Sequence, residues 1–172
     1  LHTNLFAAFV AWQRLFFVRE IIKKFPRSDS LLDFGAGSGE IGHLLPYLSN
    51  YFFIEDIEEL SNYIVSTNPQ AKRLDLQSLK DQEFAIILCL DSLEHNHNYE
   101  SLILNLTKSL TEDGIFIMSG PTENMLYKLG RWISGFKGDY HCTNVFAIEE
   151  FCNPPLNKLL KFGCNPISIL LF

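Results

Sequence analysis

Short apolar runs alternate with helical hydrophobic periods along most of this chain, and the alternation limits the folds open to it. The most apolar run, residues 84–90, is bounded by polar residues on both sides. A continuous run of this kind is typical of a strand buried on both faces, as in a parallel sheet. Repeated strand–helix units predict an α/β three-layer sandwich around a doubly wound, mostly parallel sheet.

The pattern also predicts where the elements lie. Strands are expected at residues 31–34, 51–55, 72–75, 84–90, 115–119 and 167–172. Helices are expected within residues 1–26, at 41–48 with Pro46 as a possible break, at 57–64, 99–110 and 147–152, and as a turn ending at Gly163. Ligands of such sheets bind at the carboxyl ends of the strands, so the loops after residues 34, 55, 75, 90 and 119 should line a site.

Composition narrows the function further. With 172 residues, 47% of them hydrophobic, the chain is expected to form one domain over residues 1–172. Its formal net charge of −6 argues against a nucleic-acid partner. Its four cysteines form no C-x-x-C pair, which predicts reduced thiols in a cytoplasmic protein. Neither a signal peptide nor a membrane-spanning run is expected.

A glycine-rich turn follows the first predicted strand, in the order Asp33-Phe-Gly35-Ala-Gly37-Ser-Gly39. Glycines permit a tight turn and a close approach of the backbone to a ligand. Residues 37–42 match the dinucleotide fingerprint formally. Counted from Gly35, however, which directly follows the strand, the last glycine of that fingerprint is replaced by Glu40, and a carboxylate there disfavours a diphosphate.

Asp33 completes a D-x-G-x-G-x-G pattern that resembles motif I of the class I S-adenosylmethionine-dependent methyltransferases. The family's later motifs are similar to four further segments, FFIEDIEEL, RLDL, FAIILCLDSLEH and LTEDGIFIMSGPTEN, so the similarity covers residues 31 to about 124. The resemblance implies S-adenosylmethionine as cofactor, S-adenosylhomocysteine as product, and in-line methyl transfer to a small-molecule acceptor. A carboxylate suits this cofactor, because it carries an ammonium and a sulfonium and no phosphate.

The resemblance also implies roles for individual residues. In this family an acidic residue after the second strand holds the ribose hydroxyls; Glu55 and Asp56 are both available, and a spacing of 21 residues from Gly35 favours Asp56. Asp75 takes the place of the residue that accepts from the adenine amino group. The residues expected to bind the cofactor are Asp33, Gly35, Ala36, Gly37, Gly39, Asp56, Ile57, Asp75, Leu76, Leu90 and Asp91.

Residues 120–146 follow the fifth predicted strand and are rich in basic and aromatic side chains, so they are expected to cover the acceptor. An oxygen nucleophile benefits from a base with a pKa near neutrality, and His141 and His95 are the candidates. A metal site is not expected, because the His–Cys pair lacks the spacing of zinc ligands. The acceptor is expected to be small, and aromatic or anionic.

Two other functions fit parts of the sequence. One is an NAD(P)-dependent oxidoreductase, and the other is a methyltransferase-like module that binds without turnover. The resembled family usually adds an antiparallel seventh strand, and no residues for it are found after Phe172. We therefore expect this strand to be lacking or truncated. Either the chain is cut short or a partner covers the sheet edge, and an oligomer could then form through that C-terminal edge.

Overall fold

Seven strands form one mixed sheet in the computed structural model, which describes residues 5–25, 29–121, 145–152, 160–164 and 167–171. The elements are α1 (Leu5–Ile22), β1 (Ser30–Phe34), α2 (Glu40–Leu44), β2 (Asn50–Ile54), α3 (Glu58–Thr67), β3 (Ala71–Arg73), β4 (Phe84–Leu90), α4 (Tyr99–Thr107), β5 (Leu110–Pro121), α6 (Val145–Cys152), β6 (Leu160–Cys164) and β7 (Ile167–Leu171). Two short 3₁₀ turns, Leu76–Asp81 and Leu93–His95, follow β3 and β4.

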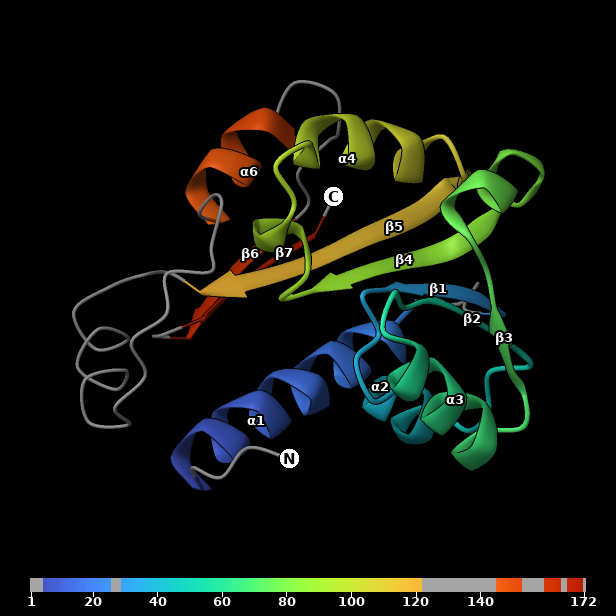
Figure 1. Cartoon of the computed structure of the whole chain (residues 1–172). Helices are drawn as coiled ribbons and strands as arrows, with labels where there is room; N and C mark the ends of the chain where they lie inside the picture. Colours follow the sequence, from blue (N-terminus) through green and yellow to red (C-terminus); the bar gives the residue numbers. More distant parts are fainter. Residues whose placement is uncertain (1–4, 26–28, 122–144, 153–159, 165–166, 172) are drawn as a thin grey trace.

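The strand order is β3-β2-β1-β4-β5-β7-β6, and β1 to β5 are all parallel. The order reverses between β1 and β4, where successive crossovers go to opposite faces of the sheet. Figure 1 shows the resulting three layers, with α1, α2 and α3 on one face and α4 and α6 on the other. The expected α/β three-layer fold is confirmed.

The expectation that the antiparallel strand is missing is wrong. β7 runs antiparallel to β5, pairing Ile117 with Leu171, and it also pairs antiparallel with β6. The sequence reasoning identified β7 as a strand but assigned the residues before it to a helical turn ending at Gly163. That glycine lies within β6, opposite Ser168. Because Gly163 was interpreted from its local sequence as the end of a helix, the first strand of the β6–β7 hairpin was not predicted.

The core has one part on each face of the sheet. On the α1 face, Leu15, Val18, Ile41 and Ile64 pack with inward residues of the strands. On the α4 face, a second cluster joins residues of α4 and α6 to the other side of the same strands. Because β4 contributes alternate residues to both clusters, its continuous apolar run is explained by burial on two faces.

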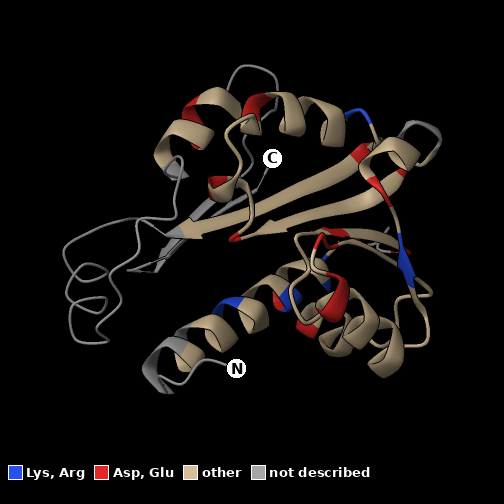
Figure 2. Ribbon diagram, in the orientation of Figure 1, with Lys and Arg blue, Asp and Glu red and all other residues tan. Residues whose placement is uncertain are grey.

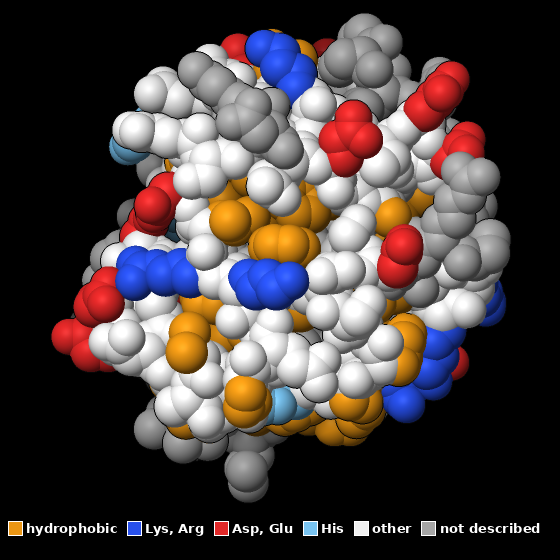
Figure 3. Space-filling model, turned by 90° about the vertical axis from the view of Figure 1, so that its right-hand side faces the viewer, with side chains coloured by type: hydrophobic (Ala, Val, Ile, Leu, Met, Phe, Trp, Pro, Cys, Tyr) orange, Lys and Arg blue, Asp and Glu red, His pale blue; other side chains and the backbone are white. Residues whose placement is uncertain are grey.

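β3 is an edge strand, and its outward side chains are basic. The Nζ atom of Lys72 lies 5.0 Å from the centroid of the Phe52 ring and 3.1 Å from the Asn50 side-chain oxygen. Arg73 donates to the Glu58 carboxylate over 2.7 Å. Figure 3 shows basic side chains beside apolar ones on this side of the molecule. Charged side chains of this kind disfavour pairing with another sheet edge.

The helix α1 lies along the sheet with Leu15, Val18 and Ile22 buried beneath it. Its 18 residues are apolar on most of its circumference, with Phe9, Trp12 and Phe16 exposed on the side away from the sheet. No helix in the described part of the chain, α1 included, is both long and apolar enough to cross a bilayer.

Candidate functional site

The carboxyl ends of β1, β2, β4 and β5 meet at one edge of the sheet, as the parallel arrangement predicts. The N–H groups of Gly35 and Ala36 donate to the carbonyl of Ile54 over 2.9 and 3.3 Å. The N–H of Asp91 donates to the carbonyl of Ser119 over 3.0 Å. These bonds join the ends of neighbouring strands, so residues far apart in the sequence share one edge of the sheet. We call this edge, at the carboxyl ends of β1, β2, β4 and β5, the site edge.

The glycine turn after β1 uses backbone conformations that favour glycine. Gly35, Gly37 and Gly39 have φ angles of 72°, 58° and 74°, all left-handed. A Cβ on Gly35 would lie 2.5 Å from the Cβ of Ser92, whereas a Cβ on Gly37 would meet no atom within 4 Å. The first glycine therefore packs against the loop after β4, and the second presents open backbone at the site edge.

Glu55 is the carboxylate that touches this turn. Its Oε2 atom accepts from the N–H of Gly37 over 2.8 Å, and its Oε1 atom accepts from the N–H of Ile57 over 2.9 Å. The side chain is half-buried, whereas that of its neighbour Asp56 is exposed. Spacing in the sequence favoured Asp56, and the structure brings Glu55 to the glycine turn.

The loop after β3 supplies residues beside those of β2. The N–H of Leu74 donates to the carbonyl of Phe53 over 2.9 Å, which places Asp75 and Leu76 next to the end of β2. Asp75 is exposed. Two apolar side chains also remain exposed here, Ile57 at 54% and Leu76 at 45%. Exposed apolar groups at the carboxyl ends of adjacent strands suit the faces of a flat aromatic ligand.

Asp33 is a buried acid beneath the turn. Its side chain is 3% exposed, and the hydroxyl of Tyr51 donates to its Oδ2 atom over 2.9 Å. Burial raises the pKa of Asp33 to about 7; the bond from Tyr51 opposes this rise, and the charges of Glu40 and Glu55 add to it. A nearby cationic ligand would favour the ionised form of this carboxyl group.

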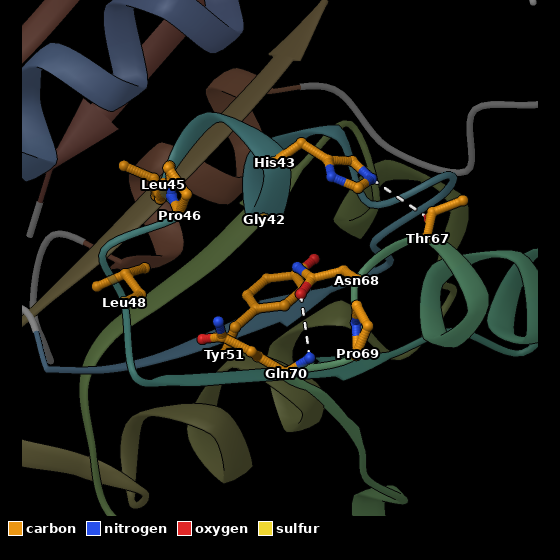
Figure 4. Close-up of a pocket in the computed structure, with 10 residues that line it drawn as sticks. All are labelled: Gly42, His43, Leu45, Pro46, Leu48, Tyr51, Thr67, Asn68, Pro69 and Gln70. Carbon is orange, nitrogen blue, oxygen red and sulfur yellow. Dashed lines mark hydrogen bonds between the residues drawn. The ribbon is translucent and has the colours of Figure 1, made fainter.

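Tyr51 also forms part of a cavity of about 200 Å³ on the α2–α3 side of the sheet. Figure 4 shows its ring among residues from the end of α2 and the end of α3. The complete lining is Gly42, His43, Leu45, Pro46, Leu48, Tyr51, Thr67, Asn68, Pro69 and Gln70. The cavity includes none of the residues expected to bind the cofactor, so it is separate from the site edge.

Arg14 reaches the site edge from α1 and pairs with Asp91 at the end of β4. Asp91 has a left-handed φ of 52° and also accepts from the Ser119 hydroxyl over 3.3 Å. Burial lowers the pKa of Arg14, while the charge of Glu94 opposes that change most strongly. The Nε atom of Arg14 is buried and has no hydrogen-bond partner in the described structure. The pair therefore places a buried and incompletely hydrogen-bonded cation at the carboxyl end of β4.

Arg14 is not among the site residues expected from the sequence. The sequence did contain a sign of its role, because Arg14 is a charged residue within the mostly apolar stretch from Leu5 to Val18. Its partner could not be read from the sequence, since α1 and the end of β4 are 77 residues apart.

The site edge is acidic as a whole. Asp33, Glu40, Glu55, Asp91 and Glu94 lie around it, Arg14 pairs with Asp91, and Arg73 donates to the Glu55 carbonyl over 3.4 Å. Figure 2 shows acidic residues near the end of β4 and around α2 and α3. Glu40, which accepts from the Ser38 hydroxyl over 2.8 Å, stands at the start of α2. This charge distribution favours a cationic ligand and disfavours a diphosphate at the helix start.

Several expected site residues remain to be placed. Gly39 and Ala36 are buried in the glycine turn, and Leu90 ends β4 directly before Asp91. His95 is exposed in the 3₁₀ turn after β4, on the same side as the site edge. His141 and residues 122–144 of the expected lid lie outside the described residues. Within the described chain, no three His, Cys, Asp or Glu side chains are grouped to hold a metal ion.

Comparison with known proteins places this chain in a family. A family model described as a methyltransferase domain matches residues 9–154. The ubiquinone biosynthesis O-methyltransferases of Rickettsia akari and Rickettsia conorii are 29% and 30% identical over 135 residues. These matches cover 72% of this chain but 53% and 46% of those proteins, so the chain spans about half the length of these curated relatives.

Two solved structures show the same fold. The magnesium protoporphyrin IX methyltransferase of Synechocystis PCC 6803, solved with bound SAH, has a TM-score of 0.77 and 14% identity, covering 99% of this chain and 88% of that one. An S-adenosylmethionine-dependent methyltransferase of Clostridium acetobutylicum has a TM-score of 0.69 and 16% identity, covering 93% and 89%. Because the family model matches most of the chain, this protein belongs to the methyltransferase-domain family and has the fold of the class I S-adenosylmethionine-dependent methyltransferases.

Proposed function

We propose that this chain transfers a methyl group from S-adenosylmethionine to a small-molecule acceptor. The observation that carries the proposal is the glycine turn with open backbone at Gly37, held by Glu55 and surrounded by carboxylates. This edge suits a ligand that is cationic and free of phosphate. The relatives named for ubiquinone biosynthesis and the neighbour named for magnesium protoporphyrin support a small-molecule acceptor.

The residues at the edge would each contact a different part of the cofactor. Glu55, or Asp56 as the sequence spacing suggests, would accept hydrogen bonds from the ribose hydroxyls. Asp75 would accept from the adenine amino group, with Ile57 and Leu76 against the faces of its ring. Asp91 would face the ammonium group, and Arg14 is the available partner for the carboxylate at the same end.

When bound, S-adenosylmethionine supplies an electrophilic methyl group on its sulfonium. The protein's own contribution is then to hold the reacting groups in line and to keep water away. His95 and His141 are the candidate bases for an oxygen acceptor, and residues 120–146 are the proposed cover. We further propose that the acceptor is aromatic or anionic and that residues 1–172 form a single domain. The proposal also includes an oligomer through the C-terminal edge of the sheet and a cytoplasmic location.

Calorimetric titration of the full chain separates this function from an NAD-dependent one. We expect S-adenosylhomocysteine to bind at least about a hundredfold more tightly than NAD, because the carboxylates of Glu40 and Glu55 repel a diphosphate. Tighter binding of NAD would overturn the proposal. Transfer of labelled methyl to a component of a small-molecule cell extract supports an enzyme, whereas binding without transfer supports a non-catalytic module.

The carboxylate contact has its own prediction. Replacing Arg14 with glutamine should weaken the binding of S-adenosylhomocysteine about 10–100-fold, the usual range for one lost charge-assisted hydrogen bond. Binding of 5′-methylthioadenosine, which lacks the amino-acid end, should stay within about twofold. Arg19→Gln is the matched control, because Arg19 lies on the same helix and pairs with Glu20 over 3.6 Å. Equal weakening of both ligands would mean that Arg14 acts only through structure.

A further inference from the structure

The outward face of α1, defined here as Phe9, Trp12 and Phe16, is an exposed aromatic stripe. These side chains are 59%, 44% and 41% exposed, and their spacing places them on one side of the helix. The rings of Trp12 and Phe16 are in contact, with centroids 5.8 Å apart. Large aromatic side chains exposed together in this way mark a surface that meets another apolar or interfacial partner.

The charged residues on and directly after the same helix indicate the charge of that partner. Arg19 lies near the end of α1, and Lys23 and Lys24 lie in the turn directly after it; the one acid among them, Glu20, lies 2.8 Å from Lys23 and 3.6 Å from Arg19. Residues 1–19 contain no Asp or Glu. The outward side of α1 therefore combines aromatic rings with an excess of positive charge, in a chain whose net charge is −6.

A second copy of α1 does not complement this surface. An antiparallel pair of α1 helices would set the basic end of each against the start of the other, where there is no acidic side chain. A parallel pair would set like charges side by side. Lipid phosphates beside the apolar boundary of a membrane complement both parts, because aromatic rings favour the interface and basic residues bind anionic headgroups.

We propose that the outward face of α1 binds the surface of a membrane that contains anionic lipids. Figure 1 shows the beginning of α1 extending past the carboxyl ends of the strands, on the side where the site edge lies. A lipid surface on the stripe would therefore border the site edge. The inward side of the same helix carries Arg14 to Asp91, so the two sides of α1 face different partners. This binding goes beyond the proposed function and stands without it.

Vesicle co-sedimentation of the full chain tests the proposal. We expect binding to vesicles of phosphatidylcholine and phosphatidylglycerol in a 3:1 ratio. The triple variant Phe9→Ser, Trp12→Ser, Phe16→Ser should lower the partition coefficient at least about tenfold. The double variant Lys23→Gln, Lys24→Gln should lower it about tenfold and remove most of its dependence on phosphatidylglycerol. Tyr47→Ser, Tyr63→Ser is the matched control, because those rings are also about half exposed but lie away from α1, in the turn after α2 and on α3.

Fluorescence shows directly whether the stripe meets lipid. The chain has two tryptophans, so Trp132→Phe leaves Trp12 as the only reporter. Its emission should shift to shorter wavelength on adding these vesicles and should be quenched by brominated lipids.

Absence of binding by the unaltered chain, or unchanged binding by the triple variant, would overturn the proposal. A stable dimer that the triple variant abolishes would overturn it too, by making a second copy the occupant. Titration with S-adenosylhomocysteine is a separate measurement, so failure here leaves the cofactor proposal standing.

Discussion

Replacing Asp33 with asparagine is expected to stabilise the ligand-free protein by about 4 kcal/mol at pH 8 and to change its stability little at pH 4. The group's pKa is raised to about 7, chiefly by burial. Between pH 4 and 7 the unfolded chain loses the Asp33 proton while the folded chain keeps it, so stability falls as the pH rises. Above pH 7 the full penalty remains, and each pKa unit corresponds to about 1.4 kcal/mol.

Urea denaturation at pH 4, 6 and 8 measures this effect. The side-chain oxygen of asparagine can still accept a hydrogen bond from the Tyr51 hydroxyl, so the substitution removes the charge and keeps this hydrogen bond. Asp29→Asn is the matched control, because Asp29 is an exposed aspartate just before β1. Equal stability of the unaltered chain and Asp33→Asn at pH 8 would show that Asp33 is not buried as described.

The same group links pH to ligand binding. A cationic cofactor favours the ionised form of Asp33, so its binding should release a proton below pH 7. Affinity for S-adenosylmethionine should therefore rise with pH up to about 7 and then level off. In Asp33→Asn this dependence should disappear.

Replacing Gly35 with alanine is expected to lower the free energy of unfolding by about 3–4 kcal/mol. Its φ of 72° is left-handed, which costs a residue with a Cβ about 1–2 kcal/mol. The added Cβ would also lie 2.5 Å from the Cβ of Ser92, and relief of such crowding typically costs about 1–3 kcal/mol. Thermal or urea unfolding gives the value.

Two further variants separate the causes. Gly37→Ala meets open space, so only the backbone term of about 1–2 kcal/mol remains. Gly35→Ala combined with Ser92→Gly removes the crowding and should recover about half of the loss. If Gly35→Ala and Gly37→Ala destabilise equally, the contact with Ser92 is not the cause.

The parallel part of the sheet could be predicted from the sequence because its signals are local. The apolar run of β4 and the glycine turn after β1 each carry their own pattern, and both agree with the structure. α2 ends at Leu44, before the Pro46 that was expected to break it. Register is less local: Phe84 pairs with Leu110 and Ile86 with Ile115, so residues 110–114, which precede the strand expected at 115–119, also belong to β5.

The other differences arise from contacts between distant segments. β6 and β7 form a hairpin in which β7 pairs with β5, and this partner is fixed by the sheet rather than by residues near Gly163. The choice between Glu55 and Asp56 depends on which carboxylate meets the N–H of Gly37, 18 residues away in the chain. The role of Arg14 likewise depends on its ion pair with Asp91, which lies 77 residues away in the sequence. The spacing of motifs in the sequence predicted which loops lie at the site edge. Which side chains within those loops contact one another could be seen only in the folded structure.

Calorimetric titration of Glu55→Gln and Asp56→Asn with S-adenosylhomocysteine, each beside the unaltered chain, tests the site most directly. The geometry predicts that Glu55→Gln weakens binding about 30-fold and that Asp56→Asn changes it less than about twofold, since only Glu55 is bonded to the glycine turn. Loss of affinity in Asp56→Asn alone would move the ribose contact to that residue. Binding that neither substitution alters would contradict a cofactor site at the acidic edge.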